Sequence, residues 1–442
     1  MTAAGLGLAF GLRYVPIPGV DIGALPGTTG AALDLGLWRV QLSVIALGLV
    51  PFIAATQLVE LVALAVPRLR PLRVGGPVPR ARLYRASLAL AVILAAIQAF
   101  FVATWLLGSS MESYSYSFSP VVPEPGGWFR LTAVLTLVAG TALLIAIAHL
   151  LSVYGLGNGF SLLIGWGLIT ELFGDGLIFL HKIKVGSASP FDLVVWIGAM
   201  VALGYATARV VAHAPRLTAS TDEPPGFGVR LPTCGIIPLT VAASLMMLPA
   251  QLSSFGLLED AAARLTPGST GYLLVFVALV AAGGYLLSLV FYRTAAVARF
   301  SGAATTAPIR AAVRQGTLIS LAFLCAALLA AHFLTRHQIA LPVDAVVILT
   351  LIALDLRAEC RWLRECPGAV KVWELHRLYA IDPLLRKLDS LGIAAHARAQ
   401  HHRAALYFFG PYLPVELTVA PEQAGQALEC VERELRTGSS EG

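Results

Sequence analysis

Five ionisable side chains fall within or at the ends of long apolar stretches of this sequence: Glu60, His149, Glu171, Asp344 and Asp355. Ionisable groups at membrane depth are functional candidates, because a charge in lipid is costly. A proton path would need a ladder of carboxylates. Hydrolysis would need a Ser/His/Asp set, an H-E-x-x-H motif or two neighbouring acids. The sequence shows none of these arrangements, so we expect neither enzymatic activity nor a bound cofactor.

The cysteines do not point to a metal site or a disulfide framework. They are dispersed, two within apolar stretches and three after the last one: Cys234, Cys325, Cys360, Cys366 and Cys430. Cys360, Cys366 and His376 come nearest to a metal-binding set, but their spacing matches no zinc pattern. An odd, scattered count also gives no disulfide framework.

Three uncharged polar residues in apolar stretches form a second group of candidates: Gln57, Gln98 and Ser244. Because such groups are costly in lipid, we expect them to face a bundle interior or a seam between helices. Two interpretations remain open. Either these three residues contribute interhelical hydrogen bonds and have no further role, or they belong to a functional seam.

The elements that position these residues are membrane spans. Hydrophobic residues make up 57% of the chain, charged residues only 13%, and the mean hydropathy is +0.78. A crossing takes about 20 mostly apolar residues. Nine stretches qualify, and the apolar piece before Pro16 is treated as a truncated first span because it lacks the features of a signal peptide. The nine are 41–66, 83–107, 129–152, 160–180, 190–212, 233–256, 270–292, 315–334 and 340–356.

The net charge of +6 reflects topology rather than nucleic-acid binding. Arginines gather in alternate connections, whereas the stretch 109–127 carries no Lys or Arg. Lys and Arg mark the cytoplasmic side, so both termini are predicted to be cytoplasmic. Most of these arginines are expected to be topology anchors or lipid contacts. Only the connection after the second span is dense enough to suggest a docking face: Arg68, Arg70, Arg73, Arg80, Arg82 and Arg85.

Short motifs that contain Gly or Pro recur in order along the apolar stretches: Pro16-Ile17-Pro18-Gly19, Ile45-Ala46-Leu47-Gly48 before Pro51, Ala139-Gly140-Thr141, Gly155-Leu156-Gly157-Asn158-Gly159-Phe160-Ser161 and Gly235-Ile236-Ile237-Pro238. A further motif, Leu289-Val290-Phe291, closes the eighth span. In these motifs and their spacing the chain resembles the SecY family, the central subunit of the Sec protein translocon. The resemblance covers most of the chain before its last 80 residues.

The resemblance implies an all-α polytopic membrane domain over residues 1–365. Ten transmembrane helices would form two inverted five-helix halves, and such repeats place the working site at their interface. An apolar ring would seal the pore by dewetting and part for a polypeptide. By motif position the ring comprises Leu49, Ile53, Phe160, Ile164, Thr240 and Ile348. Thr240 departs from the usual aliphatic residue, and Ile348 is aligned through Asp355 alone. For each residue, lipid contact or bundle packing is the alternative.

The resemblance also implies a plug and a lateral gate. The plug would be residues 21–38, which are rich in glycine, and glycine weakens helices by about 1 kcal/mol relative to alanine. The gate would include Ala54, Gln98 and Ser244. The family docks a ribosome or a SecA motor on two long basic loops, and both are short here. A divergent paralogue is therefore expected.

The C-terminal residues 366–436 are predicted to form a small soluble α/β domain with the order β-α-β-β-β-α, similar to ferredoxin-like domains. Its strands are expected at 370–375, 393–397, 404–409 and 415–419. Its first helix is expected over 383–391, and a second after Pro421. His401-His402-Arg403 is expected to be an exposed turn, and 437–442 a flexible tail.

The function implied by the resemblance is a protein-conducting channel in the bacterial inner membrane. It would pass unfolded polypeptides across the bilayer or release them into the lipids. The partners that the resemblance implies are a SecE-like clamp subunit, a SecG-like subunit, and either a SecA motor or a ribosome, with no nucleic-acid ligand. One alternative is a non-conducting scaffold or receptor that signals through the C-terminal domain. A solute transporter is a weaker alternative, because no charged site is visible at the midplane.

Overall fold

The computed structural model describes residues 1–21, 42–74, 77–115, 121–213, 235–253, 259–266, 268–291, 306–406 and 410–437. The expected plug lies outside these residues except for Asp21, as does most of the connection after the sixth span. The chain divides into two compact units, Met1–Ser187 with Phe409–Leu413, and Ala188–Phe408 with Pro414–Gly442. Each is described by itself below.

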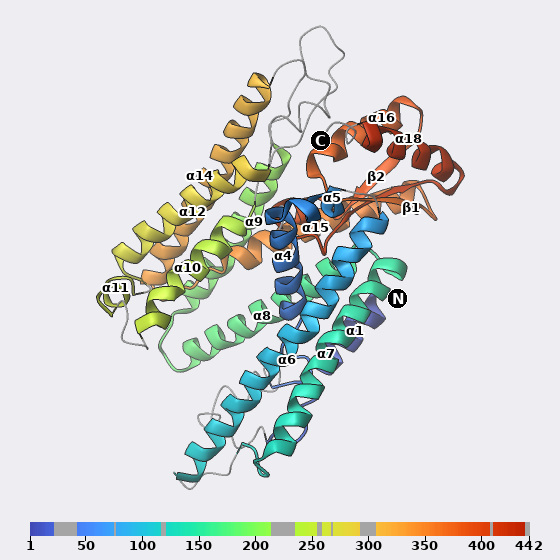
Figure 1. Cartoon of the computed structure of the whole chain (residues 1–442). Helices are drawn as coiled ribbons and strands as arrows, with labels where there is room; N and C mark the ends of the chain where they lie inside the picture. Colours follow the sequence, from blue (N-terminus) through green and yellow to red (C-terminus); the bar gives the residue numbers. More distant parts are fainter. Residues whose placement is uncertain are drawn as a thin grey trace. The chain divides into compact units, whose positions relative to one another are not determined.

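Unit 1 is helical. Its elements are α1 (Thr2–Leu12), α4 (Val50–Ala65), the 3₁₀ turn η2 (Pro67–Leu69), α5 (Arg70–Val74), α6 (Pro77–Ser115), α7 (Gly127–Tyr154) and α8 (Gly159–Lys184). Helix α6 packs against α4 and α7, and α7 packs against α8 and α1 (Figure 1). Buried alanines recur every fourth residue on α6, at Ala91, Ala95, Ala99 and Ala103. Small side chains on one helix face let neighbouring membrane helices approach closely.

A sharp bend follows α4. The axes of Val50–Ala65 and Pro67–Arg73 differ by 110°. Val66, between them, has an extended backbone (φ −88°, ψ 113°), because the ring of the following Pro67 disfavours the helical conformation for the residue before it.

Unit 2 begins with the helices α9 (Pro190–Ala212), α10 (Ile237–Ser253), α11 (Glu259–Arg264), α12 (Thr270–Phe291), α14 (Ala307–Arg336) and α15 (Val343–Glu365). Helix α12 packs against α10 and α14, and α15 packs against α9. In the described part of the chain six helices are long and apolar enough to cross a membrane, or seven with the bent pair. These agree with seven of the expected spans. The full count of ten stays a prediction, since α1 and the apolar part of α10 are shorter and α15, which contains most of the last expected span, is not among the qualifying helices.

The C-terminal part of unit 2 forms an α/β domain. Its elements are β1 (Val370–Leu375), η3 (Leu378–Ala380), α16 (Ile381–Ser390), β2 (Ala395–Arg398), α17 (Gln400–Leu406), β3 (Val415–Val419), η5 (Pro421–Gln423) and α18 (Ala424–Thr437). The antiparallel sheet has the order β1-β3-β2. Its core includes Leu384, Leu388, Leu417 and Val431, all fully buried. Three of the four expected strands and both helices are therefore confirmed.

The expected strand at 404–409 is wrong for its described residues. Residues 404–406 belong to helix α17, and 407–409 lie outside the described residues. His402 and Arg403 are buried rather than in an exposed turn, with 1% and 2% of their surfaces exposed. The reason is long-range. Asp355 of α15 accepts hydrogen bonds from the backbone N–H groups of His401 and His402, at 2.9 Å each. A carboxylate 46 residues away thus caps α17.

Candidate functional site

The Pro-Ile-Pro-Gly turn of unit 1 is fixed by backbone pairing with the start of the second apolar stretch. Pro16 and Ser43 form an antiparallel bridge. The Ile17 N–H donates to the Leu42 carbonyl at 3.0 Å, and the Val44 N–H donates to the Val15 carbonyl at 2.9 Å. Backbone that leaves the helical conformation at membrane depth needs hydrogen-bond partners. The N–H and C=O groups at these two breaks in the apolar runs supply such partners for one another.

Gly140 lets α7 pass against this paired segment. A Cβ atom at Gly140 would lie 2.8 Å from the carbonyl carbon of Val44 and nearer still to its oxygen. Ordinary carbon contacts lie about 3.5 to 4.0 Å apart. The motif Ala139-Gly140-Thr141 therefore contains a glycine because the backbone of another segment occupies the space of a side chain.

The Gly-rich motif at 155–161 sets the start of α8. Gly157 has a φ of 71°, in the left-handed region that favours glycine. The Oδ1 atom of Asn158 accepts hydrogen bonds from the N–H groups of Phe160 and Ser161 at 3.0 and 3.2 Å, which is the N-cap arrangement. A Cβ at Gly159 would lie 2.8 Å from the Ala148 carbonyl carbon. Helices α7 and α8 thus meet closely, and Phe160 is placed in the first turn of α8.

Phe160 lies in a cluster of rings. It stacks on Phe52 of α4, with ring centroids 5.3 Å apart and ring planes 20° apart. Tyr84 of α6 contacts Phe52 edge-on at 6.0 Å, and His149 of α7 contacts Phe160 edge-on at 5.3 Å. The Tyr84 hydroxyl is hydrogen bonded to Nε2 of His149. Tyr412 contacts both members of the stack edge-on, at 6.4 and 6.3 Å. The cluster joins four helices of unit 1.

Four of the six expected ring residues lie next to this stack in sequence. Leu49 is the N-cap residue of α4 and is buried, as is Phe160. Ile53 and Ile164 are half-buried. Residues four apart share one face of a helix, so α4 presents Leu49 with Ile53, and α8 presents Phe160 with Ile164.

The other two expected ring residues belong to unit 2. Thr240 is exposed on α10, and its hydroxyl donates to the Ile237 carbonyl at 3.0 Å. Ile348 is half-buried on α15. Four of the six residues therefore lie in unit 1, in or near the Phe52–Phe160 stack in sequence, and the assignment of all six to a pore ring stays a prediction.

The expected gate residues are also divided between the units. Ala54 on α4 and Gln98 on α6 are half-buried in unit 1. Ser244 is exposed on α10 in unit 2, and its hydroxyl donates to the Thr240 carbonyl at 3.0 Å. A bond of that kind satisfies a serine within its own helix, and the gate assignment stays a prediction.

The arginines of the predicted docking face divide into two groups. Arg73 and Arg80 are bound to the buried carboxylate of Glu60, each at 2.8 Å. The other four, Arg68, Arg70, Arg82 and Arg85, are exposed. Glu60 therefore ties α5 and α6 to α4 behind the 110° bend. Of the exposed four, Arg70 donates to the Leu64 carbonyl at 3.0 Å, and the docking role of this connection stays a prediction.

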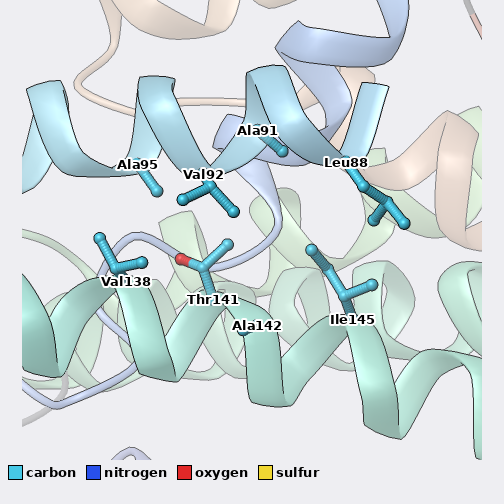
Figure 2. Close-up of a pocket in the computed structure, with 8 residues that line it drawn as sticks. All are labelled: Leu88, Ala91, Val92, Ala95, Val138, Thr141, Ala142 and Ile145. Atoms are coloured by element: carbon cyan, nitrogen blue, oxygen red, sulfur yellow. The ribbon is translucent and has the colours of Figure 1, made fainter. Parts of the chain in front are cut away.

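Thr141, which follows Gly140, lines an apolar cavity of about 140 Å³ between α6 and α7. Leu88, Ala91 and Val92 of α6 face Thr141 and Ile145 of α7 across it (Figure 2). The Thr141 hydroxyl is buried and has no hydrogen-bond partner among the described residues. The remaining lining is apolar, so the cavity fits no charged solute.

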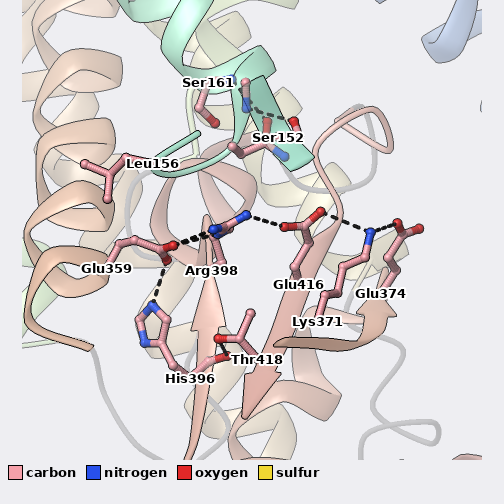
Figure 3. A network of polar contacts seen from close by, with 12 residues as sticks. Ser152, Leu156, Ser161, Glu359, Lys371, Glu374, His396, Arg398, Glu416 and Thr418 are labelled. Atoms are coloured by element: carbon pink, nitrogen blue, oxygen red, sulfur yellow. Dashed lines mark hydrogen bonds and ion pairs between the residues drawn. The ribbon is translucent and has the colours of Figure 1, made fainter. Parts of the chain in front are cut away.

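A network of charges joins α15 to the sheet of the C-terminal domain. Arg398 of β2 pairs with Glu359 of α15 at 2.7 Å and with Glu416 of β3 at 3.0 Å. Lys371 of β1 extends this network, because its Nζ atom lies 3.5 Å from a carboxylate oxygen of Glu416 (Figure 3). His396 Nε2 lies 3.4 Å from the second carboxylate oxygen of Glu359. Burial would lower the pKa of Arg398, but its two carboxylate partners outweigh burial and raise it. The pair with Glu359 thus involves a permanently charged arginine.

His402 stands apart from that network. Burial lowers its pKa to about 4, against the smaller opposing effect of Asp355. The imidazole is therefore neutral at neutral pH, and α17 is held by the Asp355 cap rather than by a charged histidine.

Two residues of the site were not expected from the sequence, Phe52 and Tyr412. Phe52 lies three residues after Leu49, and residues three apart are neighbours on a helix surface, so this spacing could have indicated its place beside the expected ring. Tyr412 is 252 residues from Phe160 and lies outside every motif, so only the fold shows their contact.

Comparisons with known proteins agree with the resemblance. A protein-family model, SecY, matches residues 43–356. The protein translocase subunit SecY of Rickettsia conorii is 29% identical over 295 residues. That alignment covers 60% of this chain and spans 66% of the relative's length. A solved structure described as a protein conducting channel aligns with a TM-score of 0.52 at 15% identity, covering 82% of this chain and 91% of that one.

A second structure, of Sec61 in a canine ribosome–channel complex, gives a TM-score of 0.51 at 15% identity over the same shares. At these identities the structural likeness shows the fold. The family model covers more than two thirds of the sequence, and the apolar helices make the chain a multi-pass membrane protein. The chain belongs to the SecY family.

Proposed function

We propose that this chain is the channel subunit of a protein translocase, which passes unfolded polypeptides across a bacterial inner membrane or releases them into it. It acts without catalysing a reaction, through a wall of apolar side chains that seals and parts. Both termini are cytoplasmic, and the ten-span arrangement with two inverted halves completes the pore. A SecE-like clamp, a SecG-like subunit and either SecA or a ribosome are its proposed partners.

One observation carries the proposal. Helices α4 and α8 of unit 1 are tied together by the stack of Phe52 on Phe160, and each presents a half-buried isoleucine, Ile53 and Ile164, beside that stack. An apolar constriction needs side chains that separate without breaking hydrogen bonds. Isoleucines on two helices held by ring contacts meet that need.

A translocation intermediate tests the proposal. A photoreactive amino acid is placed at Ile53 or Ile164, and a secretory polypeptide is stalled by a folded domain at its end. The controls are Val62 and Phe173, each nine residues along the same helix and so on its opposite face. These side chains are 52% and 68% exposed. Crosslinks from 53 and 164 but not from 62 and 173 are expected. Crosslinks from all four positions or from none would refute conduction along this wall.

The alternative, a non-conducting scaffold that signals through its C-terminal domain, makes a different prediction. The charge network that binds this domain to α15 favours such a role. A scaffold would give crosslinks from the surface of the C-terminal domain to a partner protein, with none from positions 53 and 164.

A further inference from the structure

The loop between α17 and β3 has an unusual place in the fold. Residues 410–413 pack within unit 1, although the chain on both sides belongs to unit 2. The Leu413 N–H donates to the Gly410 carbonyl at 2.9 Å, which closes a turn. Tyr412 at its tip is 5% exposed, and Leu413 is fully buried. Most connecting loops lie on the surface, whereas residues 410, 412 and 413 of this one are buried.

Tyr412 contacts the residues that join α4 to α8. Its ring lies edge-on to Phe52 at 6.4 Å and to Phe160 at 6.3 Å. Edge-on rings attract one another through their quadrupoles. Because Tyr412 touches both members of the stack, any separation of α4 from α8 must break at least one of its contacts. The proposed wall residues are close to these rings in sequence: Ile53 directly follows Phe52, and Ile164 lies four residues after Phe160.

The same loop is anchored at its other end. Asp355 caps α17 through the N–H groups of His401 and His402, and its Oδ1 atom lies 2.7 Å from the His401 ring. Asp355 lies seven residues after Ile348, so the two share a face of α15. The Asp355 cap therefore binds the start of α17 to α15 within unit 2, whereas residues 410–413, which follow α17 in the chain, belong to unit 1 with the rings of α4 and α8.

We propose that residues 410–413 form a latch, in which Tyr412 holds α4 against α8 and the C-terminal domain thereby keeps the channel closed until the latch is withdrawn. The inference rests on the proposed function, because it assigns regulation to the same wall. The occupant of the ring cluster is a segment of this chain, so closure needs no second protein.

A leak measurement tests the latch without any translocating substrate. The full-length protein is reconstituted into liposomes, and the release of a trapped small anion is followed. Tyr412→Ala should raise the leak about tenfold, the shift expected when two ring contacts are lost. Tyr412→Phe, which keeps the ring, should restore the seal. Leu391→Ala, at a side chain of the same domain that is 57% exposed, is the control and should not leak. An unchanged leak in a folded Tyr412→Ala protein would overturn the proposal.

A crosslinking measurement covers the case in which Tyr412→Ala fails to fold. A photoreactive phenylalanine analogue at position 412 should crosslink to α4 and α8 in the resting protein, and the crosslink should disappear when a stalled polypeptide occupies the channel. Absence of the resting crosslink, or its persistence with the polypeptide in place, refutes the latch. If no polypeptide enters at all while the resting crosslink and the Tyr412→Ala leak are both present, the translocation function fails and the latch stands.

Discussion

Replacing Gly140 by alanine should destabilise unit 1 far more than the same change at a neighbouring helix glycine. The added Cβ would lie 2.8 Å from the Val44 carbonyl carbon, so Val44 must retreat by about 1 Å to reach ordinary contact. That movement would stretch the 2.9 Å hydrogen bond from the Val44 N–H to the Val15 carbonyl beyond bonding range. The pairing of the Pro16 turn with the second apolar stretch would be lost with it.

The magnitude follows from these two effects. Overpacking costs about 1 to 3 kcal/mol, and a lost hydrogen bond about 1 kcal/mol, which gives about 3 kcal/mol in total. Gly167 of α8 is the matched control, because nothing lies within 4 Å of a Cβ added there. Gly167→Ala should leave stability unchanged, or raise it by up to about 1 kcal/mol through helix propensity.

Thermal unfolding of the purified protein in detergent measures the difference. For a unit of this size, about 2 to 4 °C of midpoint corresponds to 1 kcal/mol. The Gly140→Ala midpoint should therefore lie about 6 to 12 °C below the wild-type midpoint, and the Gly167→Ala midpoint at or above it. Midpoints of the two variants within 2 °C of each other would show that the close approach of α7 to Val44 is not what the motif glycine provides.

Three further changes test other parts of the structure. Glu60→Gln leaves Arg73 and Arg80 without their carboxylate, so the bend after α4 should loosen by about 3 kcal/mol and trypsin should cleave there faster. Asn158→Ala removes the cap of α8 and should cost about 1 kcal/mol, whereas Asn158→Asp should cost little, both measured by thermal unfolding. His402 titrates with a pKa of about 4 when folded, below its ordinary 6.5, so stability is full above pH 6.5 and falls with acid. Between pH 7 and pH 5 the domain should lose about 2 kcal/mol, measured by hydrogen exchange of α17 corrected for intrinsic rates, and His402→Gln should remove that part of the loss.

Each of these changes has a control in the chain. Glu124 is exposed, so Glu124→Gln should leave the trypsin pattern as it is. Equal cleavage rates for Glu60→Gln and Glu124→Gln would contradict the role of the ion pairs. Equal midpoints for Asn158→Ala and Asn158→Asp would contradict the cap. An unchanged acid dependence in His402→Gln would show that another group produces it.

The sequence predicts the local features of unit 1 well, because their causes are local. Gly157 and Asn158 make a turn and a cap from neighbouring residues, and the apolar runs reflect the solvent around each helix. Gly140 is recognisable as a motif residue for a related reason: only a position against another backbone excludes every side chain. What it packs against, the Val44 carbonyl 96 residues earlier, is visible only in the fold.

The C-terminal domain shows the opposite case. The run from Ala404 has strand-like composition, but the Asp355 carboxylate caps the preceding residues and they begin a helix. No pattern around His401 could reveal a cap on another element. Tyr412 was missed for the same reason, since nothing near it in sequence indicates a contact with Phe52 and Phe160.

The ionisable residues of the apolar stretches bear on the choice between a channel and a solute transporter. Glu60 pairs with two arginines, His149 bonds to Tyr84, and Asp355 caps α17. Asp344 lies in the first turn of α15, where a negative charge favours the helix dipole. The negative charge of Glu171 attracts the positive charge of Arg13. Glu60, Asp344 and Asp355 thus have structural uses at a bend, a helix end and a cap, which argues against a solute site built on these three carboxylates and favours the proposed transport of a polypeptide past apolar walls.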